Sequence, residues 1–116
     1  MIIFNDCLSI DKGYKFEDFK LSTFYNNQKD NRFFVLDGVY KITGIDGKFR
    51  VGLWFNEGVI KQIQMCYIDD IIENEKVREK QHNLIISNIK KMDLKSTKIF
   101  NYWDKREGHS TIIINF

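Results

Sequence analysis

The chain has no proline and no alanine, and among its 116 residues there are only two cysteines, Cys7 and Cys66. Neither cysteine belongs to a Cys-x-x-Cys motif or has a histidine at metal-ligand spacing. We therefore expect two buried free thiols in a reducing compartment, with a single disulfide as the alternative for a secreted chain. A domain of this length buries enough surface to fold without cross-links or metal, so we expect neither.

Long apolar runs are also missing. No stretch approaches the roughly 20 apolar residues that a membrane-spanning helix needs. The N-terminal segment "MIIFNDCLSI" has no basic residues before its apolar part, and Asn5 and Asp6 interrupt that part, which is not the pattern of a signal peptide. The sequence predicts a cytoplasmic protein with no membrane partner.

A surplus of one charge is missing as well. The chain has 18 basic and 16 acidic residues, a net charge of +2, and its longest basic run is Lys90-Lys91. Nucleic-acid-binding proteins usually show a basic stripe or a high isoelectric point. The interleaved charges therefore predict that nucleic acid is not a partner.

The sequence does contain many apolar and aromatic residues, 43% and 15% of the chain, spread over its whole length. Disordered chains lack such content. No repeat, linker or low-complexity segment divides the sequence, and the length is that of one ordinary domain. We expect a single domain over residues 1–116.

Strands dominate the expected structure. Residues 49–55 and 59–68 alternate apolar and polar side chains around the turn Asn56-Glu57-Gly58, which predicts a hairpin covered on one face. Asp46-Gly47 reads as a further tight turn, and Asp37-Gly38 as either a turn or a bulge. Residues 2–10 read as one strand.

Two helices and a last hairpin complete the pattern. A short helix is expected within residues 16–24 and the main helix within residues 69–92. The apolar stripe of the main helix is expected to contain Val77, Leu84, Ile85, Ile89 and Met92. Residues 99–103 and 110–116 then form a C-terminal hairpin around "DKREG". The predicted fold class is α+β: an antiparallel β-sheet meander, one main helix packed on one face, and a C-terminal β-hairpin.

The two histidines are candidates for catalysis. His109 lies near Asp104, Arg106 and Glu107, but turn side chains point into solvent and do not supply an orienting partner. His82 lies within the main helix, at the border of the apolar stripe, and a second metal ligand is missing apart from Glu79. We interpret His109 as part of a solvated turn and His82 as a boundary residue that hydrogen-bonds locally.

Other catalytic signatures are missing too. Asp69-Asp70 reads as the cap of the main helix rather than as a catalytic pair. The chain has no Gly-x-Ser-x-Gly, no phosphate-binding glycine-rich loop and no dinucleotide motif. We expect no catalytic residues, no cofactor and no metal.

Exposed aromatic residues offer a different role. Tryptophan and tyrosine are frequent in the energetic centres of protein interfaces. Trp54 alternates onto the face opposite Leu53 and Phe55, so it is expected on the open face of the sheet unless neighbouring strands cover it. The residues predicted to bind a partner are Trp54, Tyr102, Trp103, Asp104 and Arg106.

Four segments carry a resemblance to a known group: "EDFKLS", the turn "FNEGVI", "EKQHN" and the terminal "YWDKREGHSTIIINF". Together they resemble small single-domain bacterial proteins that include immunity proteins of contact-dependent toxin systems. The resemblance implies a protein that binds a cognate toxin domain and blocks it, with no catalytic residues of its own.

Three functions are therefore considered. The first is a non-enzymatic binding protein, most concretely an immunity protein whose partner is a toxin domain. The second is a small hydrolase that uses His82 or His109 with a nearby acid. The third is a homo-oligomeric module in which the C-terminal strand, as a sheet edge, pairs with a second copy.

Overall fold

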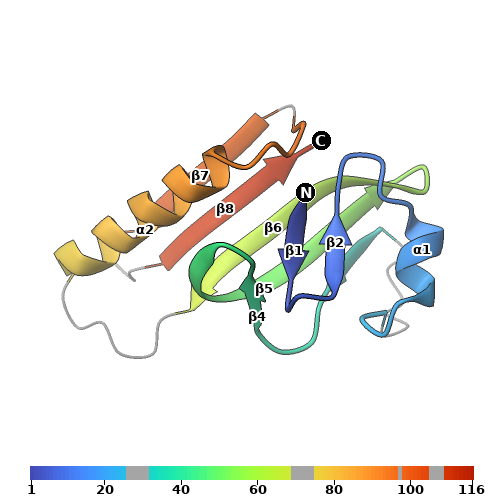
Figure 1. Ribbon diagram of the computed structural model, residues 1–116, viewed down its shortest axis with the longest axis horizontal. Coiled ribbons are helices and arrows are strands. Elements are labelled where there is room, and N and C mark those ends of the chain that lie inside the picture. The colour runs from blue at the N-terminus through green and yellow to red at the C-terminus, as the bar shows by residue number, and fades with distance from the viewer. Residues whose placement is uncertain (26–31, 69–74, 97, 105–108) are drawn as a thin grey trace.

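The computed structural model describes residues 1–25, 32–68, 75–96, 98–104 and 109–116 (Figure 1). The elements in chain order are β1 (Ile2–Phe4), β2 (Leu8–Ile10), α1 (Phe16–Leu21), β3 (Phe33–Val35), β4 (Tyr40–Ile42), β5 (Ile45–Asn56), β6 (Val59–Ile68), α2 (Glu75–Lys90), β7 (Lys98–Asp104) and β8 (His109–Asn115).

These strands form one sheet in which neighbours run antiparallel. The order across the sheet is β2-β1-β4-β5-β6-β8-β7, and β3 pairs with β5 next to β4. The main helix α2 packs against this sheet, and β7 and β8 form the C-terminal hairpin. The predicted α+β fold class is confirmed, and so is the pairing of β5 with β6.

One face of the sheet carries the core. Inward residues of β5, such as Phe49, Val51 and Leu53, are buried, while their neighbours along the strand are exposed or lie on the other face. Ile85 and Ile89 of α2 and Phe19 of α1 cover this apolar face. Figure 1 shows α2 running alongside β8, with the β1–β2 hairpin and α1 on the same side of the molecule. Burial of alternate residues accounts for the period of two seen in the sequence.

The N-terminal segment differs from its prediction. Residues 2–10 form a hairpin of two short strands rather than one strand. Asn5 and Asp6 adopt left-handed backbone angles, with φ of 51° and 57°, and the amide of Cys7 donates to the carbonyl of Phe4. Asn and Asp tolerate this conformation better than other non-glycine residues, so the two residues that interrupt the apolar run also reverse the chain.

The turns before β5 also differ from the prediction. Asp46 and Gly47 lie inside β5, and the chain reverses three residues earlier, at Thr43-Gly44, where Ile42 faces Ile45. Gly47 has a φ of 119°, and a Cβ there would lie 2.3 Å from the ring of Tyr67. Gly47 therefore does not form a turn. Its missing side chain leaves space for the ring of Tyr67 on the neighbouring strand. Of the two readings of residues 37–38, the bulge is the better one, because β3 and β4 lie along the same edge of β5.

The buried face of α2 is rotated from its predicted position. Ile85 and Ile89 are buried as expected, but Val77 and Leu84 are exposed and Met92 is only partly buried. His82 and Ile86 occupy the face instead, at helical spacing with Ile85 and Ile89. The prediction was wrong because it placed His82 at the border of the apolar stripe. In the structure His82 is buried, and its ring nitrogens have polar partners on the C-terminal hairpin.

Candidate functional site

The face of the sheet opposite α1 and α2 has no covering element among the described residues. We call it the open face and define it by the outward residues of five strands. These are Phe33 and Val35 of β3; Lys48, Arg50, Gly52 and Trp54 of β5; Gln62, Gln64 and Cys66 of β6; Thr111, Ile113 and Asn115 of β8; and Lys98, Phe100 and Tyr102 of β7.

Apolar side chains are exposed on this face. Tyr102 is 65% exposed and Trp54 is 37% exposed, and Phe100 and Val35 are also exposed. Single exposed apolar residues are ordinary, but several on one uncovered sheet face are typical of an interaction surface. The Lys98 ammonium lies 4.6 Å from the centre of the Phe100 ring, a cation–π contact that positions this ring at the sheet edge.

Two shallow hollows lie on the open face. Phe33, Val35, Arg50 and Gln64 line a hollow of about 180 Å³. Gly52 forms part of it, and a Cβ at that position would lie 2.6 Å from Cζ of Phe33, so the absence of a side chain lets this ring lie against the sheet.

The second hollow measures about 320 Å³ and lies beside Trp54, with Gln62 and Asn115 on its other side. The Gln62 amide donates to Oδ1 of Asn115 at 2.8 Å, and Gln64 donates to Oε1 of Gln62. This row of amides runs along β6 and onto β8. It offers a partner both donors and acceptors between the exposed aromatic rings.

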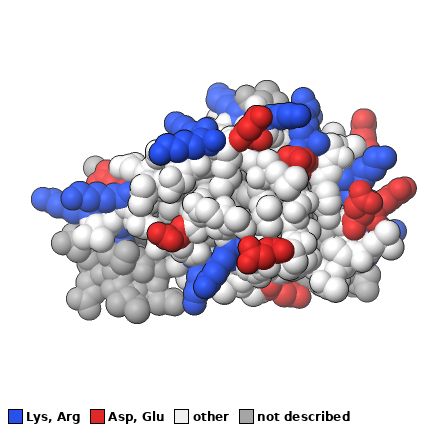
Figure 2. All heavy atoms as spheres, in the orientation of Figure 1, with Lys and Arg blue, Asp and Glu red and all other residues white. Residues whose placement is uncertain are grey.

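The charged side chains of the open face, as defined above, are those of Lys48, Arg50 and Lys98. By alternation Asp46 lies on the same side of β5 as Lys48 and Arg50, so this side of the sheet also carries a carboxylate near its end. Figure 2 shows the opposite, helix-bearing face, on which Lys and Arg side chains and Asp and Glu side chains both lie around an uncharged middle. The open face therefore favours a partner surface that carries carboxylates.

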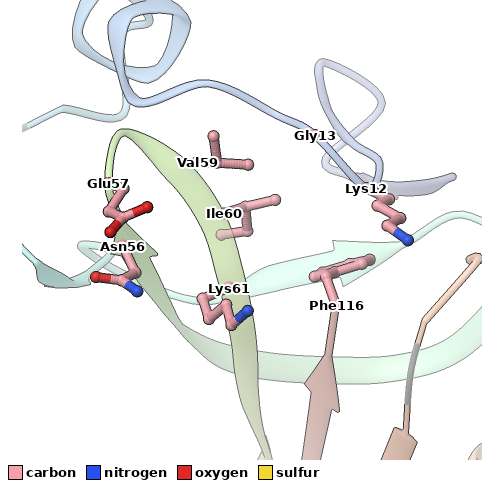
Figure 3. Close-up of a pocket in the computed structure, with 8 residues that line it drawn as sticks. All are labelled: Lys12, Gly13, Asn56, Glu57, Val59, Ile60, Lys61 and Phe116. Carbon is pink, nitrogen blue, oxygen red and sulfur yellow. The ribbon is translucent and has the colours of Figure 1, made fainter.

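A third hollow, of about 310 Å³, lies at the end of the β5–β6 hairpin (Figure 3). Lys12, Lys61 and Glu57 line it together with the ring of Phe116. Both signs of charge are present, and the lining residues include no Ser, Cys or His. Its chemistry does not indicate catalysis.

The predicted partner-binding residues separate into three groups. Trp54 and Tyr102 both lie on the open face, three strands and about four residues apart, which corresponds to roughly 20 Å. Trp103 points to the other side of β7, where its ring lies 5.7 Å from that of His82. Asp104 ends β7 opposite His109, and Arg106 lies outside the described residues.

Prediction from sequence missed Phe100, Val35 and Arg50. The alternation in "KIFNYWD" was a usable signal, since it places Phe100 on the same face as Tyr102 and Trp103 on the other. Arg50 was named only as a neighbour of Trp54. The contribution of β3 was not predicted, because the sequence of these three residues does not show which strand they pair with.

A buried polar cluster joins α2 to the C-terminal hairpin. His82 is 3% exposed and Ser110 is 1% exposed. Nδ1 of His82 hydrogen-bonds to Oγ of Ser110, and Nε2 lies 3.4 Å from Oδ1 of Asn101. Because an amide oxygen only accepts, Nε2 is the donor in its contact with Asn101. His82 thus has long-range partners, where local hydrogen bonds were predicted.

This cluster contains the elements of nucleophilic catalysis: a serine, a histidine and an amide that orients the ring. Catalysis also requires that a substrate reach the serine oxygen, and both Ser110 and His82 are buried. The hollows on the open face and at the β5–β6 hairpin are not lined by either residue. The geometry therefore supports a structural role, in which the cluster fixes α2 against the hairpin.

The cysteines are not buried as predicted. Cys7 and Cys66 are both exposed and free. Cys7 lies in the turn of the β1–β2 hairpin, whereas Cys66 lies on the open face with its Sγ 3.7 Å from Oγ1 of Thr111. Within the described ranges, His, Cys, Asp and Glu side chains do not gather into a group of three or more that would hold a metal ion.

Neither described helix has the length and apolar composition that a membrane crossing requires. In comparisons with protein-family models, with curated proteins and with solved structures, no match to this chain was found, so the resemblance to immunity proteins stays a prediction.

Proposed function

We propose that this chain is a non-enzymatic binding protein that covers the active surface of a toxin domain with its open face, as an immunity protein does. The observation that carries the proposal is the uncovered five-stranded face with exposed Trp54, Phe100 and Tyr102. An interface of standard size buries about 800 Å² on each partner, and a face of this width suits one.

The side chains of the open face indicate what kind of surface the partner presents. Arg50, Lys48 and Lys98 favour a contact surface rich in carboxylates, and the amides of Gln62 and Gln64 favour exposed backbone or polar side chains. The exposed aromatic rings supply apolar contact area at both sides of the face. The proposal includes a cytoplasmic location, which the free state of Cys7 and Cys66 supports.

The test begins with a search for a toxin domain encoded beside the gene for this chain, and a domain found there is then expressed together with the chain in bacteria. Trp54→Ala and Arg50→Glu are expected to abolish protection from growth arrest and to weaken binding of the purified toxin domain at least about tenfold. Leu84→Ala is the matched control, because Leu84 is an exposed apolar residue on the outer side of α2. Unchanged binding and protection with both open-face variants would overturn the proposal.

A homodimeric module is the second candidate, favoured by an uncovered sheet edge. The edge differs from the predicted one: β8 lies between β6 and β7, so β7 is the outermost strand. Pairing through this edge strand leaves Trp54 and Arg50 of β5 uncovered, whereas Lys98, Phe100 and Tyr102 of β7 belong to both surfaces.

A further inference from the structure

The edge formed by β7 is the long free edge of the described sheet. β7 has seven residues that pair with β8 on one side, while its other side has no neighbouring strand among the described residues. The opposite edge, β2, has only three residues, and the ion pair between the Met1 ammonium and Asp11 lies beside it. Short edges with charges resist further pairing, whereas long edges present a row of unpaired backbone groups.

The sequence of β7 is complementary to itself. When Lys98–Asp104 is placed antiparallel to a second copy of itself and centred on Asn101, Lys98 faces Asp104 at both ends. In the same register Phe100 faces Tyr102, Ile99 faces Trp103, and Asn101 faces its own copy. Every pair thus matches opposite charges, apolar with apolar or aromatic side chains, or amide with amide.

We propose that β7 pairs with β7 of a second copy of this chain, antiparallel and in this register, about a two-fold axis at Asn101. An antiparallel pair of identical strands is isologous, so each favourable contact occurs twice. The two-fold axis runs perpendicular to the sheet, which leaves the two sheets continuous and both open faces on the same side.

The exposed aromatic residues fit this arrangement. Phe100 and Tyr102 are exposed and lie on the open-face side of β7. In the dimer they form two cross-strand aromatic pairs, one on each side of the axis, and such pairs contribute to sheet stability. The outermost strands of the joined sheet are then the two copies of β2, and β3, which pairs only with β5, is equally short. Pairing therefore removes the long unpaired edge without covering Trp54 or Arg50, which lie on β5.

Charge reversal with rescue tests the register. Lys98→Asp alone or Asp104→Lys alone places like charges opposite each other at two positions, so the dissociation constant of the dimer is expected to rise roughly tenfold or more. The double variant Lys98→Asp/Asp104→Lys is expected to restore it. Within one chain these residues lie about 20 Å apart along the strand, so only pairing between copies explains a rescue.

The measurement is light scattering of the full chain over a concentration series, with circular dichroism to confirm that each variant folds. Two results would overturn the proposal. One is a wild-type chain that stays monomeric up to millimolar concentration. The other is a double variant whose dimer dissociation constant is as high as that of the single variants. The dimer dissociation constants of the open-face variants Trp54→Ala and Arg50→Glu keep this result separate from the proposed function, because both substitutions lie on β5 and leave β7 unchanged.

A cross-link provides a second readout. In a Cys7→Ser/Cys66→Ser background, Asn101→Cys places two thiols across the axis, and facing Cα atoms in antiparallel strands lie within disulfide range. Rapid formation of a covalent dimer is expected under mild oxidation. Lys98→Cys is the matched control, since its two copies lie about six residues apart in this register. Equal cross-linking of the two variants would contradict the pairing.

Discussion

His82 shows how a single polar residue positions an entire helix. Its ring nitrogens contact Ser110 and Asn101, which belong to the two strands of the C-terminal hairpin. A buried imidazole is costly unless both nitrogens have partners. The ring of Trp103 packs beside it, so polar and apolar contacts meet at one place under α2.

The first prediction concerns this cluster. Ser110→Ala leaves Nδ1 of a buried histidine without its partner and is expected to lower the free energy of unfolding by about 1–3 kcal/mol. Urea unfolding followed by circular dichroism measures the change. Ser87→Ala makes the same substitution at an exposed position of α2 and is expected to have little effect. Equal stability of the two variants would show that the His82–Ser110 hydrogen bond contributes nothing.

The second prediction concerns alkaline pH. Burial raises the pKa of Tyr40 above its ordinary value of 10.0, and the nearby Asp37 and Cys7 raise it further. Burial, followed by the charge of Asp18, likewise raises the pKa of Tyr14. The folded chain then keeps protons that the unfolded chain has lost, so stability is full below pH 10 and falls as the pH rises above it.

Urea unfolding at a series of alkaline pH values measures this loss. Tyr40→Phe removes one of the two groups and is expected to make the decline less steep. Tyrosinate absorbance, recorded in the folded and in the urea-unfolded state, reports the same shift directly. An alkaline decline that is identical in wild type and Tyr40→Phe would contradict the argument.

At the scale of elements, α2 carries most of the difference between sequence and structure. Its apolar residues occupy more than one side, and only tertiary contacts decide which side is buried. Ile85 and Ile89 face the sheet, whereas Leu84, next in sequence to Ile85, faces solvent. Helical amphipathicity alone did not distinguish them, because the decisive residue, His82, is polar.

The third prediction follows from this rotation. Ile85→Ala removes buried methyl groups and is expected to lower the free energy of unfolding by about 2–5 kcal/mol. Leu84→Ala, one residue away on the same helix, is expected to change it by less than about 1 kcal/mol. Chemical unfolding of the two variants side by side measures both values. The originally predicted stripe requires comparable losses, so similar values would favour that stripe.

Much of the sheet could be predicted from alternation. The period of two in residues 49–55 and 63–67 is kept in the structure because each strand has one buried face and one open face, whereas a register shift between Ile60 and Gln62 interrupts it in β6. The two-strand N-terminal hairpin and the displaced turn at Thr43-Gly44 could not be predicted in the same way. Both depend on the backbone conformation of a few residues. Gly47, which reads as a turn residue in the sequence, instead leaves space for the ring of Tyr67 on β6. The candidate site was half predicted, since Trp54 and Tyr102 share a face and Trp103 does not.

At the scale of the whole molecule, the two exposed cysteines lie on different parts of the surface. Cys66 lies among the outward residues of β6, and Cys7 lies in the β1–β2 turn. The fourth prediction uses this difference. A bulky maleimide on Cys66, in a Cys7→Ser chain, is expected to block binding of the toxin domain that we propose as the partner.

The matched control is the same reagent on Cys7 in a Cys66→Ser chain, which is expected to leave binding unchanged. Binding of the labelled chains to the purified toxin domain, measured by calorimetry, checks both expectations. Retained binding after labelling of Cys66 would place the partner elsewhere on the molecule and contradict the use of the open face.

The position of β8 between β6 and β7 has a consequence for how the chain folds. β7 precedes β8 in the sequence, yet it joins the sheet only through β8. The strand that comes first in the sequence thus lies outermost in the sheet. Until β8 is in place, Ile99 and Trp103 have no sheet to pack on, so we expect the two strands to close as a local hairpin and dock together as one late unit.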